Sequence, residues 1–80
     1  MKIRFYGRLG EMLGTEIDVD PPAGTDTVLK LRDVLAHAFP DASTDLRQRS
    51  RACIADSIVS ENHKLLGTET VEFFPPLSGG

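Results

Sequence analysis

One amphipathic segment, residues 28–39, constrains the fold more than any other part of this chain. Its apolar residues recur at three- and four-residue spacing and form one stripe, at Val28, Leu31, Leu35 and Phe39. The polar residues between them are expected on the solvent side, namely Lys30, Arg32, Asp33 and His37. Asp26 or Thr27 can cap the start of the segment, and Pro40 predicts its end. The pattern therefore predicts one helix with one face to bury.

The segments on both sides of this helix alternate between apolar and polar residues, which is typical of half-buried strands. "KIRFY" and "TEIDVD" predict two strands at the start, and "TVEFF" predicts one near the end. "ACIA" and "SIVS" predict two short strands around a turn at Asp56-Ser57. In contrast, the three glycines of "GRLGEMLG" favour a loop or an irregular turn. "DASTDLRQRS" is polar and predicts a loop or, at most, one short helical turn.

The order of these elements predicts an α+β fold. Two strands, one main helix and two or three further strands fit a mixed sheet with the helix packed across one face. The first and last strands can lie side by side, as in the ubiquitin-like β-grasp. A ferredoxin-like fold is the alternative, and it is less favoured because the pattern shows no second helix. We expect residues 1–76 to form the β-grasp domain and residues 77–80 to form a tail.

Composition narrows the classes of function. The chain has 80 residues, which suits one small core. The net charge of −3 disfavours nucleic acid as a partner, and we interpret the one basic cluster, at Arg47, Arg49 and Arg51, as a solvated loop. No run approaches the roughly 18 apolar residues of a membrane span, and the alternating N-terminus does not resemble a signal peptide. The single cysteine cannot form an internal disulfide, which favours a cytoplasmic protein.

The side chains offer little for catalysis or metal binding. His37 and His63 fall on polar segments, and one cysteine gives no metal-ligand spacing. Cys53 stands between Ala52 and Ile54 in a predicted strand, so we expect a small buried hydrophobic residue. No nucleophile elbow, phosphate-binding loop or dinucleotide fingerprint occurs. The sequence thus predicts no metal site, no bound cofactor and no internal active site.

The most distinctive segment is the end of the sequence, "VEFFPPLSGG". Pro75 and Pro76 lack backbone donors and should stop strand pairing, so that residues 77–80 project from the domain. Glycine has no Cβ, so Gly79 and Gly80 can thread a channel too narrow for other residues. The carboxylate of Gly80 would then be a reactive group presented to other enzymes. The alternative is a frayed terminus with accidental glycines.

Together these motifs resemble a known family. "KIRFYGRLGEMLG", the capped helix, "SIVSENHKL" and "FFPPLSGG" are similar to the small subunits of molybdopterin synthase, which are ubiquitin-like sulfur carriers. The resemblance extends over nearly the whole chain. Two phenylalanines and two prolines at a fixed distance from a terminal diglycine are its most specific part. Carriers for thiamine thiazole synthesis share the diglycine, but they usually lack the Phe-Phe-Pro-Pro run.

The resemblance implies a function without catalytic side chains in this chain. An adenylating enzyme of the ubiquitin-activating type would use ATP to activate Gly80, and sulfur would then replace AMP to give a thiocarboxylate. The tail would enter the large subunit of molybdopterin synthase, in a heterotetramer of two small and two large subunits. There it would donate sulfur to the pterin precursor. The alternatives are a carrier for another sulfur pathway, a protein modifier that forms isopeptides, and an interaction domain with an inert tail.

Strand alternation also predicts a partner surface. If Ile3 and Phe5 face the helix, Tyr6 faces away from it. By the same alternation, Ile58 and Phe74 point outward, and we expect the three outward residues to form an exposed apolar patch beside the tail. Pro75, Pro76 and Leu77 would extend this surface towards Gly79 and Gly80. The alternative is that Phe74 merely packs against the prolines.

Overall fold

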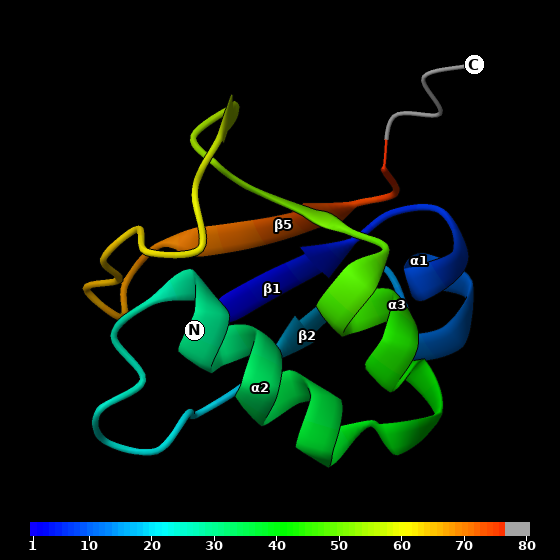
Figure 1. The fold of residues 1–80 in the computed structure, drawn as a ribbon, viewed down its shortest axis with the longest axis horizontal. Helices are drawn as coiled ribbons and strands as arrows, with labels where there is room; N and C mark the ends of the chain where they lie inside the picture. Colours follow the sequence, from blue (N-terminus) through cyan, green and yellow to red (C-terminus); the bar gives the residue numbers. More distant parts are fainter. Residues whose placement is uncertain (77–80) are drawn as a thin grey trace.

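The computed structural model describes residues 1–76. A five-stranded sheet lies behind the helices in the view of Figure 1. In chain order, the elements are β1 (Lys2–Phe5), α1 (Arg8–Leu13), β2 (Glu16–Asp18), α2 (Val28–Ala38), a 3₁₀ turn (Pro40–Ala42), α3 (Ser43–Gln48), β3 (Arg51–Ile54), β4 (Ser57–Ile58) and β5 (Thr70–Phe74).

The sheet is mixed, with the strand order β2-β1-β5-β3-β4. The first and last strands pair in parallel at its centre, where Ile3 lies opposite Val71 and Phe5 opposite Phe73. β2 pairs antiparallel with β1, and β3 and β4 form an antiparallel hairpin on the other side of β5. This arrangement confirms the predicted ubiquitin-like β-grasp.

The main helix, α2, forms where the apolar stripe predicted it. The Thr27 hydroxyl accepts a hydrogen bond from the Lys30 backbone N–H at 3.2 Å, which caps the first turn. The helix ends at Ala38, before Pro40. Its buried side chains pack against the inward residues of the sheet to form the core. The largest fully buried side chains are Phe5, Phe73, Ile3, Leu31, Leu35, Leu46, Val28 and Val71.

Two segments that we expected to be largely irregular are helical. Residues 8–13 form α1, which buries Leu9, and Gly10 lets the helix approach β1 closely. A Cβ on Gly10 would lie 3.0 Å from the backbone oxygen of Phe5. Residues 43–48 form α3, in which Leu46 is fully buried. In both segments the local sequence has only a weak preference for helix, and packing against the core stabilises the helix. The extra helices leave the β-grasp strand order unchanged.

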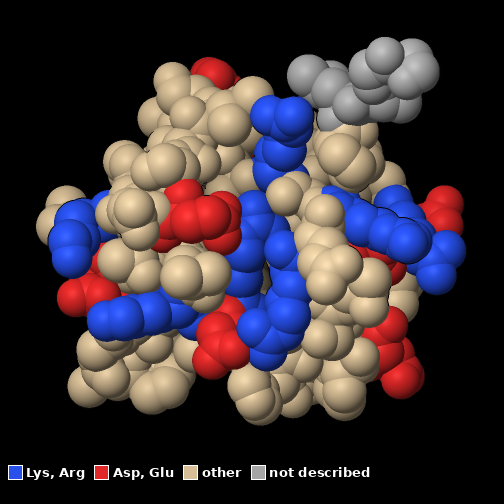
Figure 2. Space-filling model, in the orientation of Figure 1, with Lys and Arg blue, Asp and Glu red and all other residues tan. Residues whose placement is uncertain are grey.

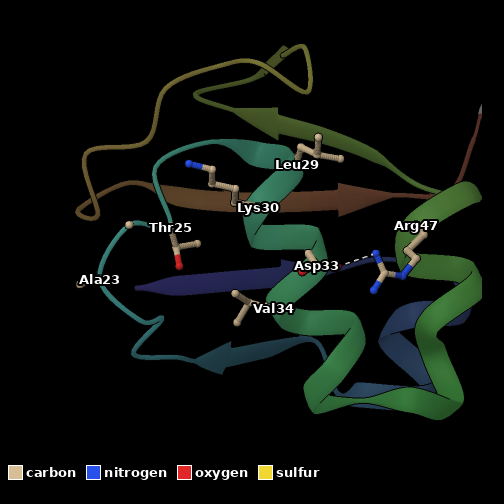
Figure 3. A pocket seen from close by; sticks show the side chains of 8 residues that line it. Ala23, Thr25, Leu29, Lys30, Asp33, Val34 and Arg47 are labelled. Carbon is tan, nitrogen blue, oxygen red and sulfur yellow. Dashed lines mark ion pairs between the residues drawn. The ribbon is translucent and has the colours of Figure 1, made fainter.

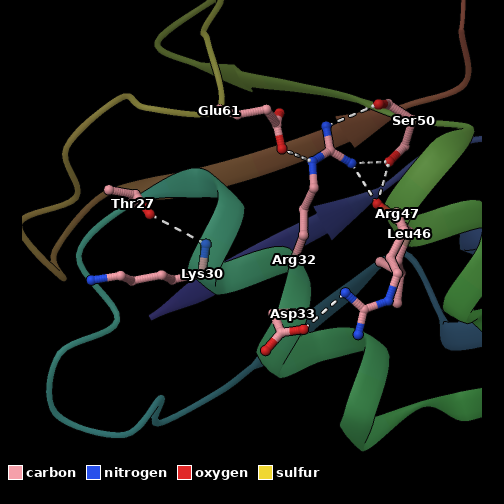
Figure 4. A network of polar contacts seen from close by, with 8 residues as sticks. All are labelled: Thr27, Lys30, Arg32, Asp33, Leu46, Arg47, Ser50 and Glu61. Atoms are coloured by element: carbon pink, nitrogen blue, oxygen red, sulfur yellow. Dashed lines mark hydrogen bonds and ion pairs between the residues drawn. The ribbon is translucent and has the colours of Figure 1, made fainter.

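Arg32 corrects a second expectation, because it is buried rather than exposed. Its guanidinium donates hydrogen bonds to the carbonyl oxygens of Leu46 and Ser50 and to the Ser50 hydroxyl. It also forms an ion pair with Glu61 at 2.7 Å and lies 5.2 Å from the centre of the Phe73 ring. Figure 4 shows how this side chain joins α2 to the segment after α3 and to the loop after β4. A buried charge is tolerated here because it is paired and hydrogen-bonded.

Within residues 1–76, no helix combines the length and apolar character that crossing a membrane requires. The same residues contain no cluster of three or more His, Cys, Asp or Glu side chains that could hold a metal ion.

Candidate functional site

The two faces of the sheet differ in how far helices cover them. Helices α2 and α3 lie over one face in Figure 1. Successive side chains of a strand point to opposite faces, so the alternate residues of β1, β5 and β3 form an outer face. Glu72 and Phe74 of β5 are only half-buried there, and Arg4 and Arg51 of the neighbouring strands are exposed. This outer face reaches the end of β5, where the chain continues to Pro75 and Pro76.

At that end of the outer face, Tyr6 and Phe74 stack in parallel. Their ring centres are 4.2 Å apart and the ring planes differ by 4°. The parallel register explains the contact. Phe5 pairs with Phe73, so Tyr6 and Phe74, which follow them in the chain, also lie side by side. Tyr6 is 37% exposed. The structure therefore brings together two of the three residues of the predicted apolar patch. Phe74 packs against an aromatic ring, that of Tyr6.

The Tyr6 ring is also held in place by a hydrogen bond of its hydroxyl group. The hydroxyl donates a hydrogen bond to the Glu72 carboxylate, with 2.5 Å between the two oxygen atoms. This hydrogen bond raises the pKa of Tyr6 above its ordinary value, because it stabilises the neutral phenol next to a carboxylate. Sequence analysis did not identify Glu72 as part of the site. Alternation places it on the outer face, but its contact with Tyr6 depends on the strand register.

Ile58, the third residue of the predicted patch, lies on the edge strand β4. It is 58% exposed and pairs with Cys53, which in turn pairs with Glu72. Strand β3 therefore separates Ile58 from β5, a distance of two strand spacings or roughly 9–10 Å. The structure does not bring Ile58 into the aromatic stack. Between them the outer face carries Arg51, opposite Phe74, and the buried Cys53.

The remaining predicted site residues follow β5. Pro75 and Pro76 are exposed, and neither belongs to a strand. Leu77, Gly79 and Gly80 lie outside the described residues.

Cys53 is buried, as the sequence predicted, but on the sheet face opposite α2. Burial raises the pKa of its thiol, and the nearby Glu72 carboxylate acts in the same direction. The thiolate form is thus disfavoured, which argues against a nucleophilic role.

The three arginines of the basic cluster lie on different elements. Arg47 belongs to α3 and forms an ion pair with Asp33 of α2 at 2.8 Å, Arg49 follows α3, and Arg51 starts β3. In Figure 2, Lys and Arg side chains run through the middle of the visible face, with Asp and Glu side chains on either side. Charges of both signs thus share this face.

A shallow hollow of about 490 Å³ lies over α2 (Figure 3). Its lining includes Leu29, Lys30 and Asp33 of α2, the loop at Ala23, and Arg47 of α3. Asp33 and Arg47 form an ion pair with each other across it. The hollow shares no lining residue with the aromatic stack.

The comparison with protein families decides the class of protein. The model of the ThiS family matches residues 3–80. The chain belongs to the ThiS family. Proteins of this family are ubiquitin-like sulfur carriers that donate sulfur in sulfurtransferase-type pathways and work with adenylating enzymes. The match confirms the sulfur-carrier part of the resemblance drawn from the sequence, whereas the specific role in molybdopterin synthesis stays a proposal.

Solved structures share the fold of this ThiS-family chain. The crystal structure of SAMP1 from Haloferax volcanii superimposes with a TM-score of 0.71 at 22% identity, covering 99% of this chain and 97% of that one. A crystal structure of the small archaeal modifier protein 1 of H. volcanii gives the same TM-score at 20% identity, with 95% of each chain covered. No curated protein matches the chain significantly.

Proposed function

We propose that this ThiS-family chain is the small subunit of molybdopterin synthase, and that the Gly80 carboxylate carries the sulfur. The supporting observation is the aromatic pair Tyr6–Phe74, placed at the end of the central strand from which the chain leads to the diglycine. A partly exposed stacked pair would give a partner a rigid apolar anchor. The chain would act in the cytoplasm.

The proposed chemistry takes place on the terminal carboxylate. A carboxylate oxygen of Gly80 attacks the α-phosphorus of ATP in the adenylating enzyme and releases pyrophosphate. The resulting acyl-adenylate has a good leaving group, and a sulfur nucleophile displaces AMP to give the thiocarboxylate. The thiocarboxylate sulfur then forms a bond to a carbon of the pterin precursor and displaces an oxygen substituent from it. Water cleaves the resulting thioester, which leaves the sulfur on the pterin and regenerates the Gly80 carboxylate. ATP is a substrate of the activating enzyme, and this chain supplies no acid, base or bound cofactor.

The proposed partners bind the outer face. Tyr6 and Phe74 would insert into an apolar depression of the large subunit, within a heterotetramer of two small and two large subunits. Ile58 would form a separate contact at the edge of the sheet, because β3 lies between it and the stack. Pro75, Pro76 and Leu77 would lead the chain into the active site, where Gly79 would pass the narrowest point.

A second candidate function is that of a protein modifier. The fold shared with the small archaeal modifier protein 1 favours it, because both chains have the same architecture over nearly their whole length. In that case, the activated Gly80 would form an isopeptide bond with a lysine amine instead of accepting sulfur. A carrier role in thiamine thiazole synthesis would use the same thiocarboxylate with another acceptor.

Intact mass spectrometry tests the activation step. The protein is incubated with the adenylating enzyme, ATP and a sulfide source, and we expect the mass increase of one oxygen replaced by sulfur. A variant without Gly80 is the control: its carboxylate is set back by roughly 3.5 Å of extended chain, and it should stay unmodified although it melts normally. An unchanged wild-type mass would leave an interaction domain with an inert tail.

Complementation then separates the pathways. Expression in a strain that lacks its own molybdopterin synthase small subunit should restore molybdoenzyme activity. Rescue of a thiamine auxotroph instead, or covalent conjugates of the chain without rescue of either strain, would refute the molybdopterin role.

A further inference from the structure

Gly7 has a backbone conformation that side chains rarely adopt. It stands between β1 and α1 with φ +65° and ψ −138°, a region that is essentially restricted to glycine. An added Cβ would lie 3.1 Å from Cγ of Pro75 and 3.4 Å from its Cδ. The proline ring therefore lies directly against the bare Cα of Gly7. Two residues that are 68 positions apart in sequence meet at this point.

This contact comes just after the last hydrogen bond between the central strands. The Tyr6 backbone N–H donates to the carbonyl oxygen of Phe73 at 3.1 Å. Pro75 and Pro76 have no backbone N–H, so neither residue can donate a further bond to the sheet. Among the described residues beyond the paired strands, packing of the Pro75 ring on Gly7 is a contact that can define the course of the chain.

We propose that Gly7 is a positioning residue. The Pro75 ring packs against it, and this contact sets the direction in which the chain leaves β5 towards the reactive carboxylate. The inference rests on the proposed function and adds a residue to it. Gly7 would act through Pro75, against which it lies, rather than through the reacting group. Its absent side chain leaves room for the proline ring, and the ring directs the segment that follows.

The effect on activation follows from the geometry that the reaction needs. The Gly80 carboxylate must meet the α-phosphate of ATP in line, and a misplacement of about 1 Å can cost roughly 10²-fold in rate. In the proposed complex the partner is bound by the Tyr6 and Phe74 rings, and Gly7→Ala changes neither ring. A displaced Pro75 should therefore lower kcat for adenylation and leave KM for the carrier unchanged.

Gly14 provides a matched control. Gly7 lies at the start of α1, and Gly14 lies at its end with φ +93°. A Cβ added to Gly14 would meet no atom within 4 Å. Gly7→Ala and Gly14→Ala therefore introduce similar backbone strain, but only the first affects Pro75. In ATP–pyrophosphate exchange with the adenylating enzyme, we expect Gly7→Ala to lower kcat at least about tenfold at constant KM. Gly14→Ala should match the wild type in both constants, and both variants should melt at similarly lowered temperatures.

A double-mutant cycle with Pro75→Ala tests the contact itself, because this substitution removes the Cγ and Cδ atoms that the methyl group of Gly7→Ala would meet. Pro75→Ala should lower kcat on its own, because the proline ring that packs against Gly7 is then missing. It is an exposed position after the last strand, so it also tests the inference if Gly7→Ala folds poorly. Adding Gly7→Ala to it should cost much less than in the wild type.

The outcomes separate this inference from the proposed function. Exchange by the wild type with equal kcat for Gly7→Ala and Gly14→Ala overturns the positioning role alone. The same holds for a Gly7→Ala effect that persists in full in the Pro75→Ala background. Absence of exchange with the wild type would overturn the proposed function, and this inference with it.

Discussion

Phe73 and Phe74 are identical side chains next to each other in β5, yet they serve the two faces of the sheet differently. Phe73 is fully buried beneath α2, stacked on Phe5 with ring centres 5.9 Å apart. Phe74 is half-buried on the outer face, stacked on Tyr6 at 4.2 Å. Each phenylalanine thus has an aromatic neighbour from the β1 side of the sheet. Among residues 1–76, the inner pair is enclosed by other side chains, whereas the outer pair is partly exposed.

The difference shows what each face contributes. The inner pair removes apolar area from water when the chain folds, and this burial stabilises the domain. The outer pair keeps part of its apolar area exposed, so a partner can still gain from covering it. Polar groups border the outer pair, with Glu72 on the Tyr6 hydroxyl and Arg51 opposite Phe74. An apolar centre with a polar rim is typical of a binding surface.

The largest expected effect is the loss of stability in Phe73→Ala. Removing a buried phenylalanine should lower the free energy of unfolding by about 3–5 kcal/mol. That is a large part of the roughly 5–15 kcal/mol that holds a small domain together. Urea denaturation followed by circular dichroism measures the change. A loss below about 1 kcal/mol would contradict the assignment of Phe73 to the core.

Phe74→Ala should show the opposite profile. If the large subunit of molybdopterin synthase is the partner, as proposed, we expect its affinity for this chain to fall by about 2 kcal/mol, roughly thirtyfold, while the thermal melt of the free domain changes little. Titration calorimetry measures the affinity. Leu29→Ala is the control, because Leu29 is 54% exposed on α2, away from the outer face, and should leave binding unchanged. A collapsed melt, or unchanged binding, would show that the two phenylalanines do not divide the roles in this way.

The alternating strands and the apolar stripe allowed most of the fold to be predicted. Each pattern depends on residues close together in sequence, and the inward positions Ile3, Phe5, Val71 and Phe73 are all buried. Helices α1 and α3 could not be predicted in the same way. Leu9 and Leu46 stabilise them by packing against distant parts of the chain, and the glycines and polar residues around them indicate loops locally.

The candidate site could be predicted only in part, because it depends on how the strands are ordered. Alternation placed Tyr6, Ile58 and Phe74 on the outer face. Parallel pairing of β1 with β5 brings two of them together, while β3 keeps Ile58 apart. The contact between Gly7 and Pro75 was missed entirely. It requires the close approach of two segments from opposite ends of the sequence, and a glycine gives no local sign of it.

Cys53→Ala sharpens the comparison with a smaller effect. Cys53 is buried on the outer face, so its removal should cost about 1 kcal/mol of stability as a small cavity forms. Thiocarboxylate formation on Gly80 should be unaffected, because the raised pKa of the Cys53 thiol disfavours the nucleophilic thiolate. Intact mass spectrometry after activation checks this. Loss of the sulfur-bearing product at normal stability would instead give Cys53 a part in sulfur relay.

The smallest expected effect is a change in the titration of Tyr6, which reports on the polar border of the outer pair. The hydrogen bond to Glu72 raises the pKa of Tyr6, so the folded state favours the neutral phenol. Its stabilising contribution is present below the ordinary tyrosine pKa of about 10 and is lost as the pH rises through the higher folded value. Tyr6 is the only tyrosine of the chain, so ultraviolet absorbance of the phenolate follows it directly. Glu72→Ala should bring the midpoint closer to that of the urea-unfolded protein. Identical midpoints for the wild type and Glu72→Ala would mean that Glu72 does not hold the Tyr6 hydroxyl in solution.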